Sequence, residues 1–194
     1  MTQVLGTVLV SALGLPKPVF AEPPPSPDDN RYENPNYFYS VRIPKGLHCR
    51  TDPAPHPNHG CSINLSQHYR SHVWVDGSYN TLARETAADA LFYALDSELR
   101  SGCTLEISRR EPALLGSLQA ERISFHHTCG KEWLAHEYVV ALRSIPNCCE
   151  LIYTVAFVST LETEATHRAL LEEIVASWTN LTPEEAPKRA PVSD

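Results

Sequence analysis

The chain has 194 residues, 42% of them hydrophobic, and a formal net charge of −7. This length suits one domain with a hydrophobic core and is short for two. The negative charge and the absence of any Lys/Arg cluster argue against a general nucleic-acid-binding protein, because neutralising phosphates requires clustered positive charge.

The first 21 residues predict an export signal. An apolar stretch runs from Val4 to Leu15, and Val19-Phe20-Ala21 resembles a signal peptidase site. No Lys or Arg precedes the apolar stretch, which departs from the usual pattern. That stretch is shorter than the ~20 residues of a membrane-spanning helix. We therefore expect cleavage after Ala21, a periplasmic or secreted protein, and no stable membrane insertion after cleavage.

The rest of the chain divides by composition. Residues 22–36 are rich in proline and polar side chains, which predicts a linker without a core. Residues 37–180 form the expected single domain. Residues 181–194 resemble the linker in composition and predict a disordered tail.

The first half of the domain alternates like strands and then changes to a helical period. Strands are expected over 37–44, 61–66 and 71–79, the last with a turn at Asp76-Gly77. A helix is expected next, with Asn80 as its cap and Gly102 as its stop. Its inner face would carry Ala88, Leu91, Phe92, Leu95 and Leu99.

Four more strands and a closing helix follow. The strands are expected over 103–110, 117–127, 132–144 and 150–159, joined by turns at 111–116, 129–131 and 145–148. Short connections between alternating strands predict an antiparallel meander. In the last helix, about 162–178, Ser159 and Glu162 could form a capping box. Its inner face would carry His167, Leu171, Ile174 and Trp178. The class is α+β, with an antiparallel sheet of N-terminal strands plus the meander and two helices.

Three short segments resemble the Mog1/PsbP-like fold family, over nearly the whole of residues 37–178. They are an opening with Phe38, Val41, Ile43, Pro44 and Gly46, the run Gly116-Ser117-Leu118-Gln119-Ala120-Glu121, and the closing Ile174-Val175-Ala176-Ser177-Trp178. The resemblance implies a binding or assembly module, since members serve photosystem subunits, small GTPases and cell-envelope partners. The family has no shared catalytic residues, and its fold does not require the cysteines and histidines found here.

An even number of cysteines after the expected cleavage site predicts disulfides in an oxidising compartment. We expect Cys49 to bond Cys61 across a proline-stiffened loop. We expect Cys103 to bond Cys129, because the meander brings both to one end of the sheet. Cys148 and Cys149 are left, either as a strained vicinal disulfide or as a free pair, and the pattern does not choose.

Histidines provide the candidate metal ligands. His56, His59 and Cys61 could supply three ligands to zinc from one loop, but a disulfide at Cys61 would remove one of them. In the hairpin around Gly130, His136 would lie beside His126 or His127, depending on the strand register. These histidines could bind a metal or titrate near neutral pH. No cofactor is otherwise expected.

The leading hypothesis is an exported, non-enzymatic module that binds a protein partner not identified by the sequence. Hydrolase, metalloprotease, phosphate-loop and kinase motifs are missing. Aromatic anchors for a partner could be Trp74, Tyr79 and Trp133. The alternative is a metal-binding protein, a carrier or a small metallohydrolase, that uses the loop and hairpin histidines. A third hypothesis is redox activity at Cys148 and Cys149.

Overall fold

The computed structural model describes residues 30–51, 59–66, 70–99 and 103–183. The described strands are β1 (Arg31–Asn34), β2 (Tyr39–Arg42), β3 (Cys49–Arg50), β4 (Gly60–Asn64), β5 (His72–Tyr79), β6 (Thr104–Leu115), β7 (Leu118–Thr128), β8 (Leu134–Ile145), β9 (Cys149–Thr160) and β10 (Thr179–Asn180). The helices are α1 (Ala87–Leu99) and α2 (Glu164–Ala176). This content confirms the α+β class.

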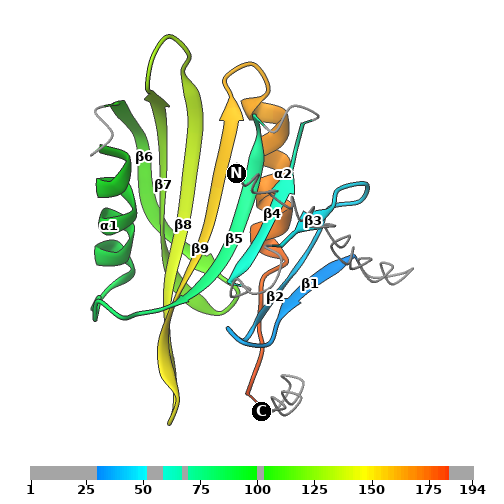
Figure 1. The fold of residues 1–194 in the computed structure, drawn as a ribbon, viewed down its shortest axis with the longest axis vertical. Coiled ribbons are helices and arrows are strands. Elements are labelled where there is room, and N and C mark those ends of the chain that lie inside the picture. Colours follow the sequence, from blue (N-terminus) through cyan, green and yellow to red (C-terminus); the bar gives the residue numbers. More distant parts are fainter. Residues whose placement is uncertain (1–29, 52–58, 67–69, 100–102, 184–194) are drawn as a thin grey trace, which may run out of the picture.

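Seven strands form one antiparallel sheet in the order β3-β4-β5-β9-β8-β7-β6. Strands β6 to β9 pair consecutively, and β5 joins them by pairing with β9. Figure 1 shows this long sheet with α1 alongside β6, β7 and β8. The expected meander is therefore confirmed, and the N-terminal strands extend it at one edge.

A second sheet has three strands in the order β1-β2-β10. Its first strand lies inside the predicted linker, which therefore ends at or before residue 30 instead of at 36. The reason is packing that a composition-based boundary does not detect. The ring centroids of Tyr32 and Tyr39 lie 6.0 Å apart, and Asn34 is fully buried.

The other predicted boundaries fall largely outside the described residues. The expected signal segment 1–21 lies there, as do residues 184–194 of the expected tail. Within the described part, the amide of Leu181 donates a hydrogen bond of 2.9 Å to the carbonyl of Phe38. The domain therefore extends at least to Leu181, one residue past the predicted boundary at 180.

The two helices cover opposite faces of the long sheet, as adjacent residues of β8 show. Tyr138 belongs to the cluster of side chains beneath α1, together with Leu91 and Leu95. The side chain of the preceding residue, Glu137, points the other way and forms an ion pair with Arg168 of α2. Neighbouring strand residues alternate between faces, so this pair fixes the three-layer arrangement.

The larger core lies between the long sheet, the small sheet and α2. The indole of Trp178 stacks on the ring of Tyr39 at 4.5 Å between centroids. As expected, the inner side of the closing helix and its end are buried, through His167, Leu171, Ile174 and Trp178. Among the described residues, neither helix is long and apolar enough to cross a bilayer.

The expected N-terminal caps are wrong at both helices, and the expected stop at Gly102 lies outside the described residues. Asn80 instead closes a turn, donating to the carbonyl of Arg84 and accepting from its amide, each at 2.8 Å. Helix α1 begins later, where Thr86 and Asp89 bond reciprocally in a capping box. At α2, Ser159 bonds the ring of His167 at 2.9 Å and does not cap the helix.

The predicted turn at Asp76-Gly77 lies inside a strand, and the predicted turn at 111–116 is a turn only at its last residue, Gly116. Asp76 and Gly77 continue β5, where a side chain at residue 77 would come within 2.7 Å of Tyr37. The glycine therefore marks close packing and not a turn. Strand β6 runs on through Pro112 because it is the outermost strand, where a missing N–H costs no ladder hydrogen bond.

Candidate functional site

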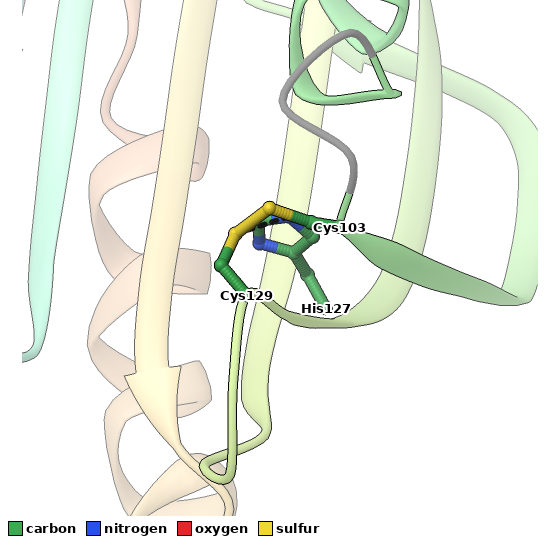
Figure 2. Close-up of side chains that lie close together, drawn as sticks. All are labelled: Cys103, His127 and Cys129. Atoms are coloured by element: carbon green, nitrogen blue, oxygen red, sulfur yellow. Dashed lines mark hydrogen bonds between the residues drawn. A yellow bond between two sulfur atoms is a disulfide. The ribbon is translucent and has the colours of Figure 1, made fainter.

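One end of the β6–β7 hairpin gathers cysteine and histidine. Thr104 pairs with Thr128, so the residues just outside this pair, Cys103 and Cys129, face each other. They form a disulfide, as expected. Figure 2 shows the imidazole of His127 beside the two sulfur atoms. Among the described residues, Cys103, His127 and Cys129 form a group whose potential ligand atoms all lie within 4.8 Å of one another.

The register left open by the sequence is settled in favour of His127. Phe125 pairs with His136 across β7 and β8, so the rings of His127 and His136 share a face, with centroids 5.1 Å apart. His126 points to the opposite face, where its Nε2 lies 3.5 Å from a carboxylate oxygen of Glu164. The hairpin therefore brings together two of its three candidate histidines.

The imidazole of His136 is unusual because it is buried without a polar partner. It is 6% exposed, and neither ring nitrogen has a hydrogen-bond partner. It stacks on Phe125 at 4.9 Å between centroids. Burial, and to a smaller extent the neighbouring His127 and His72, lower its pKa to about 4. Burying a hydrogen-bond donor and acceptor without partners costs free energy of folding, so this ring is a candidate to bind a ligand.

In the described part of the proline-rich loop, the candidate metal ligands His59 and Cys61 have other partners. Cys61 is fully buried and bonded to Cys49, so its sulfur is not available as a ligand. The ring of His59 stacks on Tyr37 at 5.0 Å, and its Nδ1 lies 3.3 Å from the carbonyl oxygen of Gly77. His56 lies outside the described residues. A disulfide therefore ties the two ends of the loop together, as expected.

Cys148 and Cys149 are free thiols, which decides between the two alternatives that the sequence left open. They lie where β8 turns into β9, next to Asn147, whose φ is 58°. Burial raises the pKa of Cys149 to about 11, and its hydrogen bond and charge interaction with Cys148 act in the same direction. A high pKa makes this thiol a poor nucleophile at neutral pH.

The outer surface of α1 carries an exposed aromatic pair that the sequence analysis misplaced. Phe92, expected on the inner face, is 54% exposed, and Tyr93 is 51% exposed. Arginine guanidinium groups lie over both rings: Arg84 is 4.6 Å from the Tyr93 centroid, and Arg110 of β6 is 4.7 Å from that of Phe92. Adjacent helix positions point about 100° apart, so Leu91, Phe92 and Tyr93 could not all face inward.

This aromatic pair borders an open hollow of about 590 Å³, which we call the α1 hollow. Its lining is Ala83, Arg84, Glu85, Asp89, Phe92, Tyr93 and Asp96. A second hollow of about 430 Å³ shares Ala83, Arg84 and Glu85 and extends to Glu150 at the start of β9. Acidic side chains outnumber the one arginine in the α1 hollow. The surface therefore combines apolar rings with negative charge.

The turn before α1 is held in a strained conformation at the wall of this hollow. Ala83 has a φ of 49°, in the left-handed region that costs a residue with a side chain roughly 1–2 kcal/mol. The Asn80 side chain fixes the turn through Arg84. Strain of this kind persists where surrounding structure enforces it and is concentrated at functional sites.

The aromatic residues proposed earlier as partner anchors lie elsewhere. Trp74 and Trp133 are half-buried, and Tyr79 is 47% exposed with its ring 5.4 Å from that of Tyr37. They come from β5 and from the segment before β8, and none of them lines the α1 hollow. Their role as partner contacts stays a prediction.

No protein-family model matches the chain, and no curated protein matches it in sequence. Solved structures do match. The chain is similar to the cyanobacterial PsbP of Synechocystis sp. PCC 6803, with a TM-score of 0.56 and 14% identity over 77% of this chain and 91% of that one.

Two other solved structures lead to the same fold. One is LpqN of Mycobacterium tuberculosis, a protein involved in cell envelope biogenesis, with a TM-score of 0.56 and 10% identity over 79% of this chain and 86% of that one. The other is the Ran-binding protein Mog1p of Saccharomyces cerevisiae, with a TM-score of 0.51 and 12% identity over 84% of this chain and 100% of that one. The chain has the Mog1/PsbP-like fold, as its sequence motifs indicate.

Proposed function

We propose that this protein is an exported, non-enzymatic binding module and that the α1 hollow holds a basic segment of a partner protein. The observation that carries the proposal is the exposed pair Phe92 and Tyr93 beside an acidic hollow. The proposed location is the periplasm or the extracellular space.

The aromatic pair supplies apolar contact area. Two neighbouring rings that are about half exposed leave a large apolar surface in water on a helix whose other side is packed. Aromatic side chains bury roughly 150–250 Å² each when covered and dominate binding energy at interfaces. A partner that covers both rings would therefore gain most of its affinity here.

The charges select the kind of partner. Glu85, Asp89 and Asp96 line the hollow, and Asp89 is already engaged in the helix cap. Arg84 and Arg110 already lie over the two rings, which shows that these rings accept a guanidinium group. A partner segment with Arg or Lys would compete for the ring faces and pair with the carboxylates.

The disulfides and the fold support the rest of the proposal. Two disulfides in a domain of this size are typical of oxidising compartments. The similar structures include a Ran-binding protein and a cell-envelope protein. A fold alone does not specify a function, so the α1 hollow and not the resemblance carries the proposal.

The test is selection of binding peptides from a random peptide library displayed on phage, against the full exported chain with both disulfides formed. We expect enrichment of sequences that combine Arg or Lys with apolar residues. The variant Phe92→Ser/Tyr93→Ser should then bind the selected peptides at least roughly 30-fold more weakly, the equivalent of losing one hot-spot contact of about 2 kcal/mol.

Two control variants make the selection decisive. Leu161→Ser removes an apolar side chain of similar exposure, 46%, from the β9–α2 connection and should leave affinity unchanged. Glu85→Gln/Asp96→Asn should weaken binding and reduce its dependence on salt. Selected peptides that lack positive charge, or that bind the Phe92/Tyr93 variant as tightly as the native chain, would refute the proposal.

A further inference from the structure

We propose that Cys103, Cys129, His127 and His136 form a zinc-type metal site that is closed by the Cys103–Cys129 disulfide and opened by its reduction. The site lies at the β6–β7 hairpin end, on the side of the sheet that α1 covers. It is separate from the α1 hollow, with which it shares no residue.

The ligand set has the composition that zinc prefers. Two thiolates and two neutral imidazoles make a Cys2His2 site, and two thiolates balance the charge of a divalent ion. Such a neutral group is compatible with a partly buried position, whereas an isolated ion is not. The two histidines come from neighbouring strands and the two cysteines from the ends of one hairpin. The register gathers Cys103, His127 and Cys129 at one point and places His136 beside His127.

The distances made by His127 suit a tetrahedral ion, whereas the two sulfurs, bonded to each other in the disulfide, must separate before both can bind it. Zinc bonds of about 2.0–2.3 Å place tetrahedral ligand atoms roughly 3.3–3.8 Å from one another. The Nε2 of His127 lies 3.3 Å from the Sγ of Cys129. Two imidazoles on one such ion have ring centroids roughly 5 Å apart, and those of His127 and His136 are 5.1 Å apart.

His136 provides an independent indication of a ligand. Its ring is 6% exposed, makes an edge-to-face contact with the ring of His127, and has both nitrogens without a hydrogen-bond partner. Buried polar atoms are almost always satisfied, so an unsatisfied imidazole next to the imidazole of His127 needs a reason. A bound metal ion would satisfy one nitrogen directly.

The disulfide controls the site because a thiolate, and not a disulfide sulfur, binds zinc. A dithiol reductant attacks the exposed sulfur of Cys129, the S–S bond breaks, and Cys103 leaves as a thiolate. The second thiol of the reductant then resolves the mixed disulfide. Two electrons pass from the dithiol, which becomes a disulfide, and the two cysteines take up its two protons. Metal binding releases these protons.

Exposure favours reduction of this bond over that of the other disulfide. Cys129 is exposed and Cys103 half-buried, whereas Cys61 of the second disulfide is fully buried. Access to an external thiolate is one of the factors that set the rate of exchange. Mild reduction is therefore expected to open Cys103–Cys129 first and leave the Cys49–Cys61 disulfide intact.

Cobalt(II) is the probe, because thiolate ligation and tetrahedral geometry both give it visible absorption. The experiment uses the full chain carrying Cys148→Ser/Cys149→Ser, so that the free thiols cannot bind the ion. After reduction we expect one cobalt per chain, with thiolate-to-cobalt charge-transfer and tetrahedral d–d bands, and displacement of cobalt by zinc. The oxidised protein should give no such bands.

Three further variants identify the ligands. Cys103→Ser/Cys129→Ser should abolish the bands, and His136→Leu, which keeps both cysteines, should weaken cobalt binding at least roughly tenfold. His126→Gln, on the opposite face of the same strand, should bind like the parent. Circular dichroism checks that each reduced variant is folded.

The outcomes separate cleanly. Bands that require reduction, Cys103, Cys129 and His136 support the proposal, as does reduced protein that unfolds and is refolded by zinc. Absence of bands in the reduced parent, reduced protein that zinc cannot refold, or equal bands in the Cys103/Cys129 variant would overturn it. Unchanged affinity in His136→Leu would remove that residue from the site and contradict the four-ligand proposal.

Discussion

Replacing Glu137 by Gln should cost the domain about 3 kcal/mol of unfolding free energy. The Glu137 carboxylate is 1% exposed and meets two guanidinium groups, that of Arg122 at 2.8 Å and that of Arg168. It also accepts a hydrogen bond of 2.8 Å from Ser124. The substitution keeps the shape of the side chain and removes its charge, so that both arginines lose their central partner.

The magnitude follows from burial. Removing one member of a buried ion pair costs roughly 3–5 kcal/mol. The lower end applies here because Arg168 is 30% exposed and because Arg122 keeps an ion pair with Glu172 at 2.9 Å. Burial would lower the pKa of Arg168, yet Glu164 and Glu137 raise it overall, so these two carboxylates stabilise its charge.

Urea unfolding followed by circular dichroism measures this loss. For a domain of this size we expect the melting temperature to fall by about 6–12 °C as well. The matched control is Glu121→Gln, which breaks the exposed pair with Arg110 at 3.3 Å and should cost less than about 1 kcal/mol. Equal losses in the two variants would refute the claim that the Glu137 network anchors α2 to the sheet.

Three further predictions concern glycine, histidine and cysteine. Gly60→Ala should destabilise the domain by at least about 1–3 kcal/mol in urea unfolding, because the added carbon would lie 1.8 Å from the Val75 carbonyl oxygen. The control Gly130→Ala should be neutral, because its added carbon would meet no neighbouring atom within 4 Å. The free energy of unfolding should fall by at most about 3 kcal/mol from His136 alone as the pH falls from about 6.5 to about 4, because in this range only the unfolded chain protonates this histidine. His136→Phe should flatten the dependence of stability on pH, and an unchanged dependence in this variant would contradict the prediction. Alkylation of the native chain should modify Cys148 well before Cys149, and mass spectrometry that finds the reverse order would contradict the pKa argument.

Much of the fold could be predicted because the spacing of hydrophobic residues along the chain reflects which side chains are buried. The alternation in 117–127 and 150–159 corresponds to β7 and β9, where inward residues are core. Errors arose where one residue type serves two purposes. Glycine and proline are common in turns. Gly77, however, lies in close contact with a neighbouring side chain, and Pro112 lies on an edge strand. Only the neighbouring strands decide between these uses.

The candidate sites divide in the same way. The two disulfides could be predicted because the loop spacing and the hairpin geometry bring their cysteines together. The pairing of His136 with Phe125 could not, since a shift of one residue would exchange the faces. The α1 hollow was missed because Phe92 satisfied an inward period, although the adjacent Tyr93 showed that the helix had apolar residues on more than one face.

The most direct test of the central claim is NMR mapping of a selected basic peptide on the isotope-labelled, oxidised chain. The proposed function predicts that backbone amide shifts concentrate at Glu85, Phe92, Tyr93 and Asp96, and that they vanish in the Phe92→Ser/Tyr93→Ser variant. Shifts centred instead on Trp74 or Trp133, with the α1 hollow unaffected, would contradict the proposal and place the binding surface elsewhere.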